Sequence, residues 1–161
     1  MTPVPPLPAG GDPSPGLTDL DRLCAVQELR LLKARFCRYV GARAWRDLER
    51  LFTPQGQARV YDTDGRLVLF ADGAEIAPTL EARIGRAQTV LHAYTDELTI
   101  TSPTSADGLW AMEDRIVFPG DEDDPPRWMH GYGHFHETYE RHGSRWLIRS
   151  LELTRVRVDH G

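Results

Sequence analysis

The chain has 161 residues, of which 40% are hydrophobic and 27% are charged, and its formal net charge at pH 7 is −5. These values are typical of one soluble globular domain and exclude a fibrous or wholly disordered chain. No apolar run approaches the roughly 20 residues of a membrane span, and the acidic balance disfavours a basic nucleic-acid-binding face. We therefore expect neither a membrane nor a nucleic acid as a partner.

The cysteines and the N-terminal segment indicate the cellular setting and the extent of the domain. Cys24 and Cys37 fall in one predicted helix, and at about 1.5 Å per residue they are too far apart to form a disulfide. Thiols without a disulfide framework favour a reducing, cytoplasmic location. Residues 1–17 are mostly proline, glycine and small residues, which predicts a disordered arm, and residues 18–159 are predicted to form a single domain.

Three helices are predicted in the first half of the domain. Apolar side chains recur every three or four residues over 18–40, with Thr18 and Asp21 as a capping box and Gly41 as the stop. The shorter elements that follow are a helix over 45–52, strands over 58–61 and 67–70, and a third helix that Asp72 and Glu75 cap and that ends near Ile84.

After Gly85 the sequence changes to long segments rich in β-branched and aromatic residues. Helices followed by a meander of strands predict an α+β fold, with the three N-terminal helices packed on one face of a curved, mostly antiparallel sheet. The four long strands are expected at residues 90–100, 109–118, 129–140 and 146–158.

Alternation along three of these strands places one ionisable side chain of each on a mainly apolar face. His92, Asp114 and Arg155 each share the parity of the apolar residues in their own strand. Taken singly, each has a structural explanation, such as a hydrogen-bonded core histidine. Buried charges are costly unless they pair or line a wet pocket, so the three together predict one shared pocket.

The chemistry of such a pocket would be proton transfer. His92 is the expected general base or acid, because imidazole works in both directions near neutral pH. Asp114 would orient that imidazole, and Arg155 would steady a developing enolate or carboxylate, or would clamp Asp114 in its ionised form. Apolar walls suited to a flat polycyclic ligand are expected from Phe36, Tyr39, Trp45, Trp110, Met112 and Phe135.

The fifth predicted strand carries a second conspicuous pattern. His134 and His136 share a strand face, as the start of a metal site would, and with Glu140 they superficially resemble a cupin's His-x-His-x3-Glu pattern. The rest of the cupin pattern does not follow. The favoured interpretation is therefore a polar outer face without metal, with Gly131 and Gly133 facing inward and leaving room for a ligand.

Four segments stand out in the order in which they occur along the chain: LLKARFCRYV, ARAWRDLERLFTP, TVLHAYTDELTITSPTSADGLWAMEDRIVF and GYGHFHETYERHGSRWLIRSLELTRVRVD. Taken together and in this order, they resemble the SnoaL-like family of the nuclear transport factor 2-like superfamily. The superfamily includes bile-acid 7α-dehydratase, scytalone dehydratase and polyketide cyclases. The resemblance implies a cone-shaped fold with an internal pocket, cofactor-free acid–base work on a small hydrophobic substrate, and a homodimer or homotrimer built on the sheet face.

The resemblance also assigns site residues. By motif, the strand His, Asp and Arg of the bile-acid dehydratase type fall on His92, Asp114 and Arg155. The helix Tyr and Asp of that type are replaced by Phe36 and Gly41, so a phenol and the main acid–base carboxylate are missing.

These departures shape the expected function. Tyr94, or with less support Tyr39, would replace the lost phenol as a donor to a carbonyl. The expected activity is that of a cyclase, dehydratase or isomerase of polyketide-, terpenoid- or steroid-like carbonyl compounds, and the missing Asp favours cyclisation. The alternatives are a non-catalytic small-molecule binding or assembly module on the same fold and a His-ligated metalloenzyme.

Overall fold

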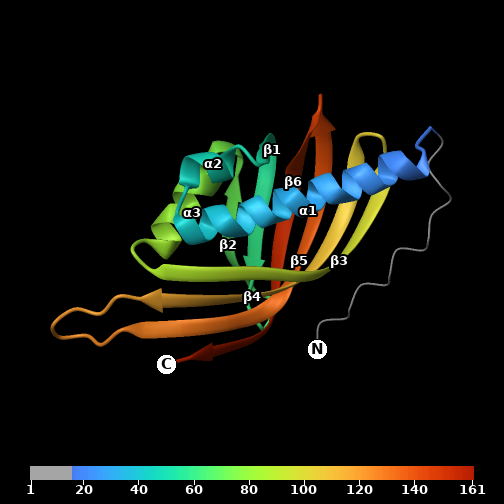
Figure 1. Cartoon of the computed structure of the whole chain (residues 1–161). Coiled ribbons are helices and arrows are strands. Elements are labelled where there is room, and N and C mark those ends of the chain that lie inside the picture. Colours follow the sequence, from blue (N-terminus) through green and yellow to red (C-terminus); the bar gives the residue numbers. More distant parts are fainter. Residues whose placement is uncertain (1–15) are drawn as a thin grey trace.

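A computed structural model describes residues 16–161 as helices on one side of a single six-stranded sheet (Figure 1). Residues 1–15, which hold most of the predicted arm, lie outside the described part. The helices are α1 (Asp19–Ala42), α2 (Trp45–Glu49) and α3 (Ile76–Ile84), with a 3-10 turn at Gly73–Glu75. The strands are β1 (Phe52–Tyr61), β2 (Leu67–Asp72), β3 (Gln88–Ser102), β4 (Ser105–Phe118), β5 (Arg127–His142) and β6 (Arg145–His160).

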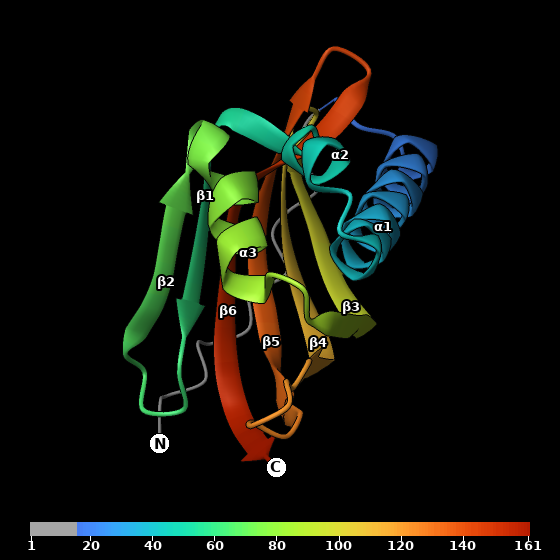
Figure 2. The ribbon, with the colours of Figure 1, turned by 90° about the vertical axis from the view of Figure 1, so that its left-hand side faces the viewer.

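The sheet has the order β2-β1-β6-β5-β4-β3, and its only parallel pair among the described strands is β1 with β6. Seen from its end, the sheet curls so that its two edges lie on either side of α3 (Figure 2). Leu29, Leu48, Ile76 and Ile148 are fully buried in the core of the molecule. The predicted α+β arrangement is thus confirmed. No helix within residues 16–161 combines the length and the apolarity needed to cross a membrane.

The first helix begins as predicted and ends slightly later. The Thr18 hydroxyl accepts the Asp21 backbone N–H at 3.1 Å, and the Asp21 carboxylate accepts the Thr18 N–H at 2.9 Å, which completes the capping box. The helix continues through Gly41 and is closed by Arg43 in the left-handed region at φ 54°. Arg43 therefore takes the role that the sequence suggested for glycine.

Two of the short elements differ from the prediction. The helix expected over 45–52 ends at Glu49, and β1 begins at Phe52 because it pairs in parallel with β6. The side chain of Asp72 makes no capping hydrogen bond before α3. Pro78 lies in the first turn of that helix, where its missing N–H costs no intrahelical bond.

Strand β3 contains a bulge that changes which face its side chains occupy. Tyr94 pairs with Ala111 and Asp96 pairs with Trp110, so Thr95 is an extra residue without a partner, and its φ is 22°. A bulge of this kind reverses the alternation of side chains along the strand. The guanidinium of Arg30 in α1 donates to Asp96 at 3.0–3.2 Å and holds the strand against the helix at this point.

Candidate active site

A cavity of about 960 Å³ lies against the inner face of the sheet and is lined mainly by apolar side chains. Its volume is at the upper end of the range typical of small-molecule sites, so it can hold a multi-ring ligand. The apolar lining includes Phe36, Phe52, Leu91, Met112, Phe135 and Leu153.

Asp114 of β4 and Arg155 of β6 form an ion pair in the wall of this cavity. The Nη1 and Nη2 atoms of Arg155 donate to the two carboxylate oxygens of Asp114 at 2.5 and 2.7 Å. Both side chains are only 9% exposed. A two-pronged contact of this kind fixes the orientation of both groups and offsets much of the cost of burying their charges. The predicted meeting of Asp114 and Arg155 is therefore confirmed.

The Asp114–Arg155 ion pair reaches across β5, which lies between β4 and β6 in the sheet. The contact is possible because β5 has a glycine, without a side chain, at this position. Gly131 is opposite Asp114 in the register, and a Cβ placed on it would lie 2.1 Å from Nη1 of Arg155 and 2.5 Å from Oδ1 of Asp114. Gly131 and Gly133 face inward, as predicted. The space over Gly131 is occupied by the ion pair itself, whereas we expected a ligand there.

His92 and Tyr94 are not in the cavity, which corrects the prediction of a three-residue cluster. Both side chains are exposed on the outer face, and Leu91 occupies the inward position opposite Asp114. The prediction counted strict alternation from residue 90 to residue 100. Because the bulge at Thr95 interrupts that alternation, the residues before it face the opposite way from those after it.

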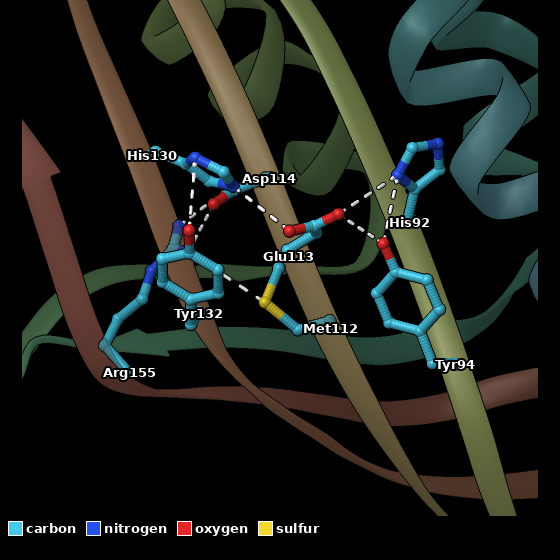
Figure 3. Close-up of polar contacts among 8 residues, drawn as sticks. All are labelled: His92, Tyr94, Met112, Glu113, Asp114, His130, Tyr132 and Arg155. Atoms are coloured by element: carbon cyan, nitrogen blue, oxygen red, sulfur yellow. Dashed lines mark hydrogen bonds and ion pairs between the residues drawn. The ribbon is translucent and has the colours of Figure 1, made fainter.

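On the outer face, His92 and Tyr94 gather with His130 and Tyr132 around the carboxylate of Glu113 (Figure 3). The Tyr94 hydroxyl donates to Glu113 Oε1, and the Glu113 carboxylate lies 3.5 Å from His92 Nδ1 and 3.1 Å from His130 Nε2. The ring of Tyr132 stacks on that of His130 at 4.5 Å. We call these five residues the outer cluster.

The hydrogen bonds of the outer cluster alter two pKa values. The bond from Tyr94, followed by that from His130, lowers the pKa of Glu113. The same bond to Glu113 raises the pKa of Tyr94 to about 12, because ionisation would replace a hydrogen bond with repulsion between two negative charges. The polar groups of the outer cluster therefore have hydrogen-bond partners within the cluster. The cluster lies on the face of the sheet opposite to the one that carries the Asp114 side chain.

The predicted apolar walls are confirmed for three residues and corrected for three. Phe36, Met112 and Phe135 line the cavity, whereas Tyr39, Trp45 and Trp110 do not. Trp110 is buried deeper and donates its indole N–H to the Tyr139 hydroxyl at 2.9 Å. Tyr39 and Trp45 are half-buried and pack against the core from the helices.

A buried ion pair beside the cavity was not predicted. Nζ of Lys33 in α1 donates to Glu137 of β5 at 2.5 Å, and the two side chains are 2% and 0% exposed. Two signals were available in the sequence. Lys33 lies on the apolar stripe of the first helix, and Glu137 has the inward parity of Gly133 and Phe135.

His134 and His136 do not converge on a common point. Their ring centroids are 6.5 Å apart, and His136 Nε2 lies 3.1 Å from the Thr154 hydroxyl. Burial, followed by the neighbouring His134, lowers the pKa of His136. Among residues 16–161 no three His, Cys, Asp or Glu side chains are arranged to hold a metal ion.

Comparisons with known proteins agree with this architecture. Residues 21–152 match the model of the SnoaL-like domain. "Probable cyclase FGR4" of Gibberella zeae is 21% identical over 133 residues, which cover 77% of this chain and 86% of that protein.

Two solved structures illustrate the fold. A candidate scytalone dehydratase of Novosphingobium aromaticivorans superposes with a TM-score of 0.72 at 16% identity, over 88% of this chain and 91% of the other. The hexachlorocyclohexane dehydrochlorinase LinA-type3 of Novosphingobium barchaimii gives 0.71 at 16% identity, over 89% and 94%.

At such low identity these structures establish the fold, which is the cone-shaped nuclear transport factor 2-like fold. The match to the domain model spans most of the chain. The Gibberella zeae relative is, by its name, an enzyme that processes small molecules. The chain belongs to the SnoaL-like family.

Proposed function

We propose that this protein is a cofactor-free acid–base enzyme that processes a hydrophobic carbonyl compound inside the cavity. One observation carries the proposal: a carboxylate and a guanidinium meet in the wall of a large, otherwise apolar cavity. The ion pair is neutral overall, which favours an uncharged substrate. The expected class is polycyclic, with polyketide-, terpenoid- or steroid-like rings, and the reaction is a cyclisation, dehydration or isomerisation.

In this proposal Asp114 accepts a proton from the carbon next to the substrate carbonyl. Arg155 stabilises the negative charge that develops on the carbonyl oxygen. A guanidinium has five N–H donors, and two of those on Arg155 are directed at Asp114, so donors remain for a substrate oxygen. The proton then returns to another carbon in an isomerisation or leaves with a hydroxyl group as water in a dehydration. In a cyclisation the enolate carbon attacks a second carbonyl, and the oxygen of that carbonyl takes up the proton from Asp114 to become a hydroxyl group.

Exchange of hydrogen for deuterium at that carbon tests the proposal without knowledge of the natural substrate. We expect the wild-type protein to accelerate deuteration of a bicyclic ketone such as 1-tetralone in heavy water, followed by NMR. Asp114→Asn should lower the rate by about a hundredfold or more, the usual contribution of a positioned base.

Glu113→Gln is the matched control, because Glu113 directly precedes Asp114 in β4 and points to the outer face. Glu113→Gln and His92→Ala should both retain the wild-type exchange rate. The proposal fails if Asp114→Asn exchanges as fast as wild type, or if wild type accelerates exchange in none of a series of bicyclic and tricyclic ketones.

A non-catalytic binding module is the second candidate, and a specific observation favours it. The inward position beside Asp114 is occupied by Leu91, and the imidazole of His92 is on the other face. A binding module would bind the ketones in the cavity without exchanging their protons, so the same samples separate the two functions.

We also propose that copies of the chain associate into a homodimer or homotrimer through the outer face of the sheet. Val90 and Tyr94 leave apolar surface there, at 53% and 45% exposure, and exposed apolar surface of this kind is common at subunit contacts. Val90→Lys should then produce a monomer in sedimentation equilibrium, and an unchanged mass would contradict this association.

The two cysteines are not disulfide-bonded, in keeping with a cytoplasmic location.

A further inference from the structure

One wall of the cavity is built from three phenylalanine rings. Phe36 contacts the other two edge to face, with ring centroids 6.3 Å from Phe52 and 5.8 Å from Phe135. All three rings line the cavity, and we call them the aromatic wall. Along β5, Phe135 follows Gly131 by four residues, so the wall lies about 13 Å from the level of the Asp114–Arg155 pair at 3.3 Å per residue.

A buried cation lies directly behind the aromatic wall. Nζ of Lys33 is 3.5 Å from the ring centroid of Phe135 and 4.6 Å from that of Phe36. Lys33 itself does not line the cavity, and its side chain is 2% exposed. The ammonium group therefore contacts the rings from the protein interior, and a ligand would contact them from the cavity.

A chain of hydrogen bonds supports the charge on Lys33. Glu137 accepts from Lys33 and from the Tyr139 hydroxyl, and Tyr139 in turn accepts from the Trp110 indole N–H. Burial lowers the pKa of Lys33, and the neighbouring Glu137 carboxylate opposes that shift. The contacts with the faces of Phe135 and Phe36 also favour the charged form.

We propose that the aromatic wall is a subsite for an electron-rich aromatic ring of the ligand and that Lys33 creates this preference from behind. A cation draws the π electrons of a ring toward itself. The cavity side of each ring, whether its opposite face or its C–H edge, then becomes more positive. A phenolic or methoxy-substituted ring binds better to such a surface than a cyano- or nitro-substituted ring of the same shape.

The aromatic subsite adds to the proposed function by naming one part of the substrate. It rests on that function only in so far as the substrate binds in the same cavity. It is tested by binding rather than by turnover. 2-Methoxynaphthalene and 2-cyanonaphthalene have similar shapes and opposite electronic character. Their affinities can be measured by displacement of a fluorescent apolar reporter such as 1-anilinonaphthalene, and the ratio of the two affinities is the result of interest.

The decisive variant is Lys33→Met with Glu137→Gln, which removes both charges together. Methionine keeps the length of the side chain at 33, and glutamine keeps an oxygen that can accept from Tyr139. We expect the affinity ratio to shift by about fivefold toward the cyano compound, a change at the upper end of what a solvent-exposed cation–π contact contributes. Leu32→Met is the control. Leu32 is the buried residue directly before Lys33 in α1, its replacement changes no charge, and the variant should keep the wild-type ratio of the two affinities.

Phe135→Leu provides a second variant in case the double variant does not fold. It removes the ring nearest to Lys33 and should shift the ratio in the same direction. The proposal is overturned if the ratio stays at the wild-type value in either folded variant. Failure of deuterium exchange would remove the proposed enzymatic function and leave this result intact, while an unshifted ratio would remove only the aromatic subsite.

Discussion

Glu113 and Asp114 are consecutive carboxylates on one strand, and their surroundings differ almost completely. Asp114 faces the cavity and is held by a single guanidinium, with 9% of its side chain exposed. Glu113 faces outward, is 31% exposed, and has two imidazoles and a phenol as partners. One step along the backbone thus separates a group that can act on an apolar ligand from one that belongs to a network of polar side chains on the outer face of the sheet. The face of the strand, more than the residue type, decides the chemistry.

The largest expected contrast between the two faces is in stability. Arg155→Met leaves Asp114 buried without a counterion and should lower the free energy of unfolding by about 3–5 kcal/mol. Arg157→Met, two residues along β6, removes an exposed partner of Asp159 and should change stability little. Urea denaturation of both variants measures the difference. Equal effects would show that the Asp114–Arg155 pair is not isolated from water, and adding Asp114→Leu to Arg155→Met should recover stability.

The glycine that admits the ion pair should also be sensitive to substitution. Gly131→Ala places a Cβ on Nη1 of Arg155 and on Oδ1 of Asp114, and we expect a loss of about 1–3 kcal/mol from overpacking. The loss should be smaller in an Arg155→Met background, where the clashing guanidinium is gone. Additive effects in the double-mutant cycle would mean that Gly131 is required for another reason.

A hydroxyl on the inner face should be dispensable. Thr89 is 9% exposed, and its Oγ1 has no hydrogen-bond partner among residues 16–161. Thr89→Val keeps the shape and removes the buried hydroxyl, so the free energy of unfolding should rise by about 1 kcal/mol. Thr138→Val is the outer-face control, because Thr138 shares a hydrogen bond of 2.7 Å with Ser150. A gain at position 138, or a loss at position 89, would contradict this assignment.

The smallest expected effect is a titration on the outer face. The pKa of Tyr94 is raised from 10 to about 12, so its contribution to stability is complete below pH 10 and is lost as the pH rises through 12. The difference in phenolate absorbance between wild type and Tyr94→Phe isolates this group. In Glu113→Gln its pKa should return toward 10, and a pKa that stays near 12 in that variant would rule out Glu113 as the cause.

Most of the fold could be predicted from local patterns. The capping box of Thr18 and Asp21, the four long strands and the inward row of β4 with Met112 and Asp114 all follow from periodicity and side-chain chemistry. The early start of β1 could not be predicted, because it depends on parallel pairing with β6, almost a hundred residues later in the chain.

The site could be predicted only in part, for two physical reasons. Asp114 and Arg155 lie on strands whose alternation is intact around them, whereas His92 and Tyr94 precede a bulge that contains no glycine to signal it. Lys33 and Glu137 were within reach of the same periodic patterns. Charged residues are usually placed outside, and only tertiary packing shows that these two neutralise each other.

The extra residue at Thr95 has a consequence for how this chain is compared with its relatives. Successive side chains of a strand point alternately to the inner and the outer face of the sheet. One inserted residue therefore exchanges the two faces for all side chains on one side of the insertion. A histidine can therefore stand in the expected column of an alignment and still project away from the ligand. Deleting Thr95 would restore strict alternation along β3. One half of the strand would then have to rotate so that its inward and outward side chains exchange faces, and the Arg30–Asp96 ion pair would oppose that rotation.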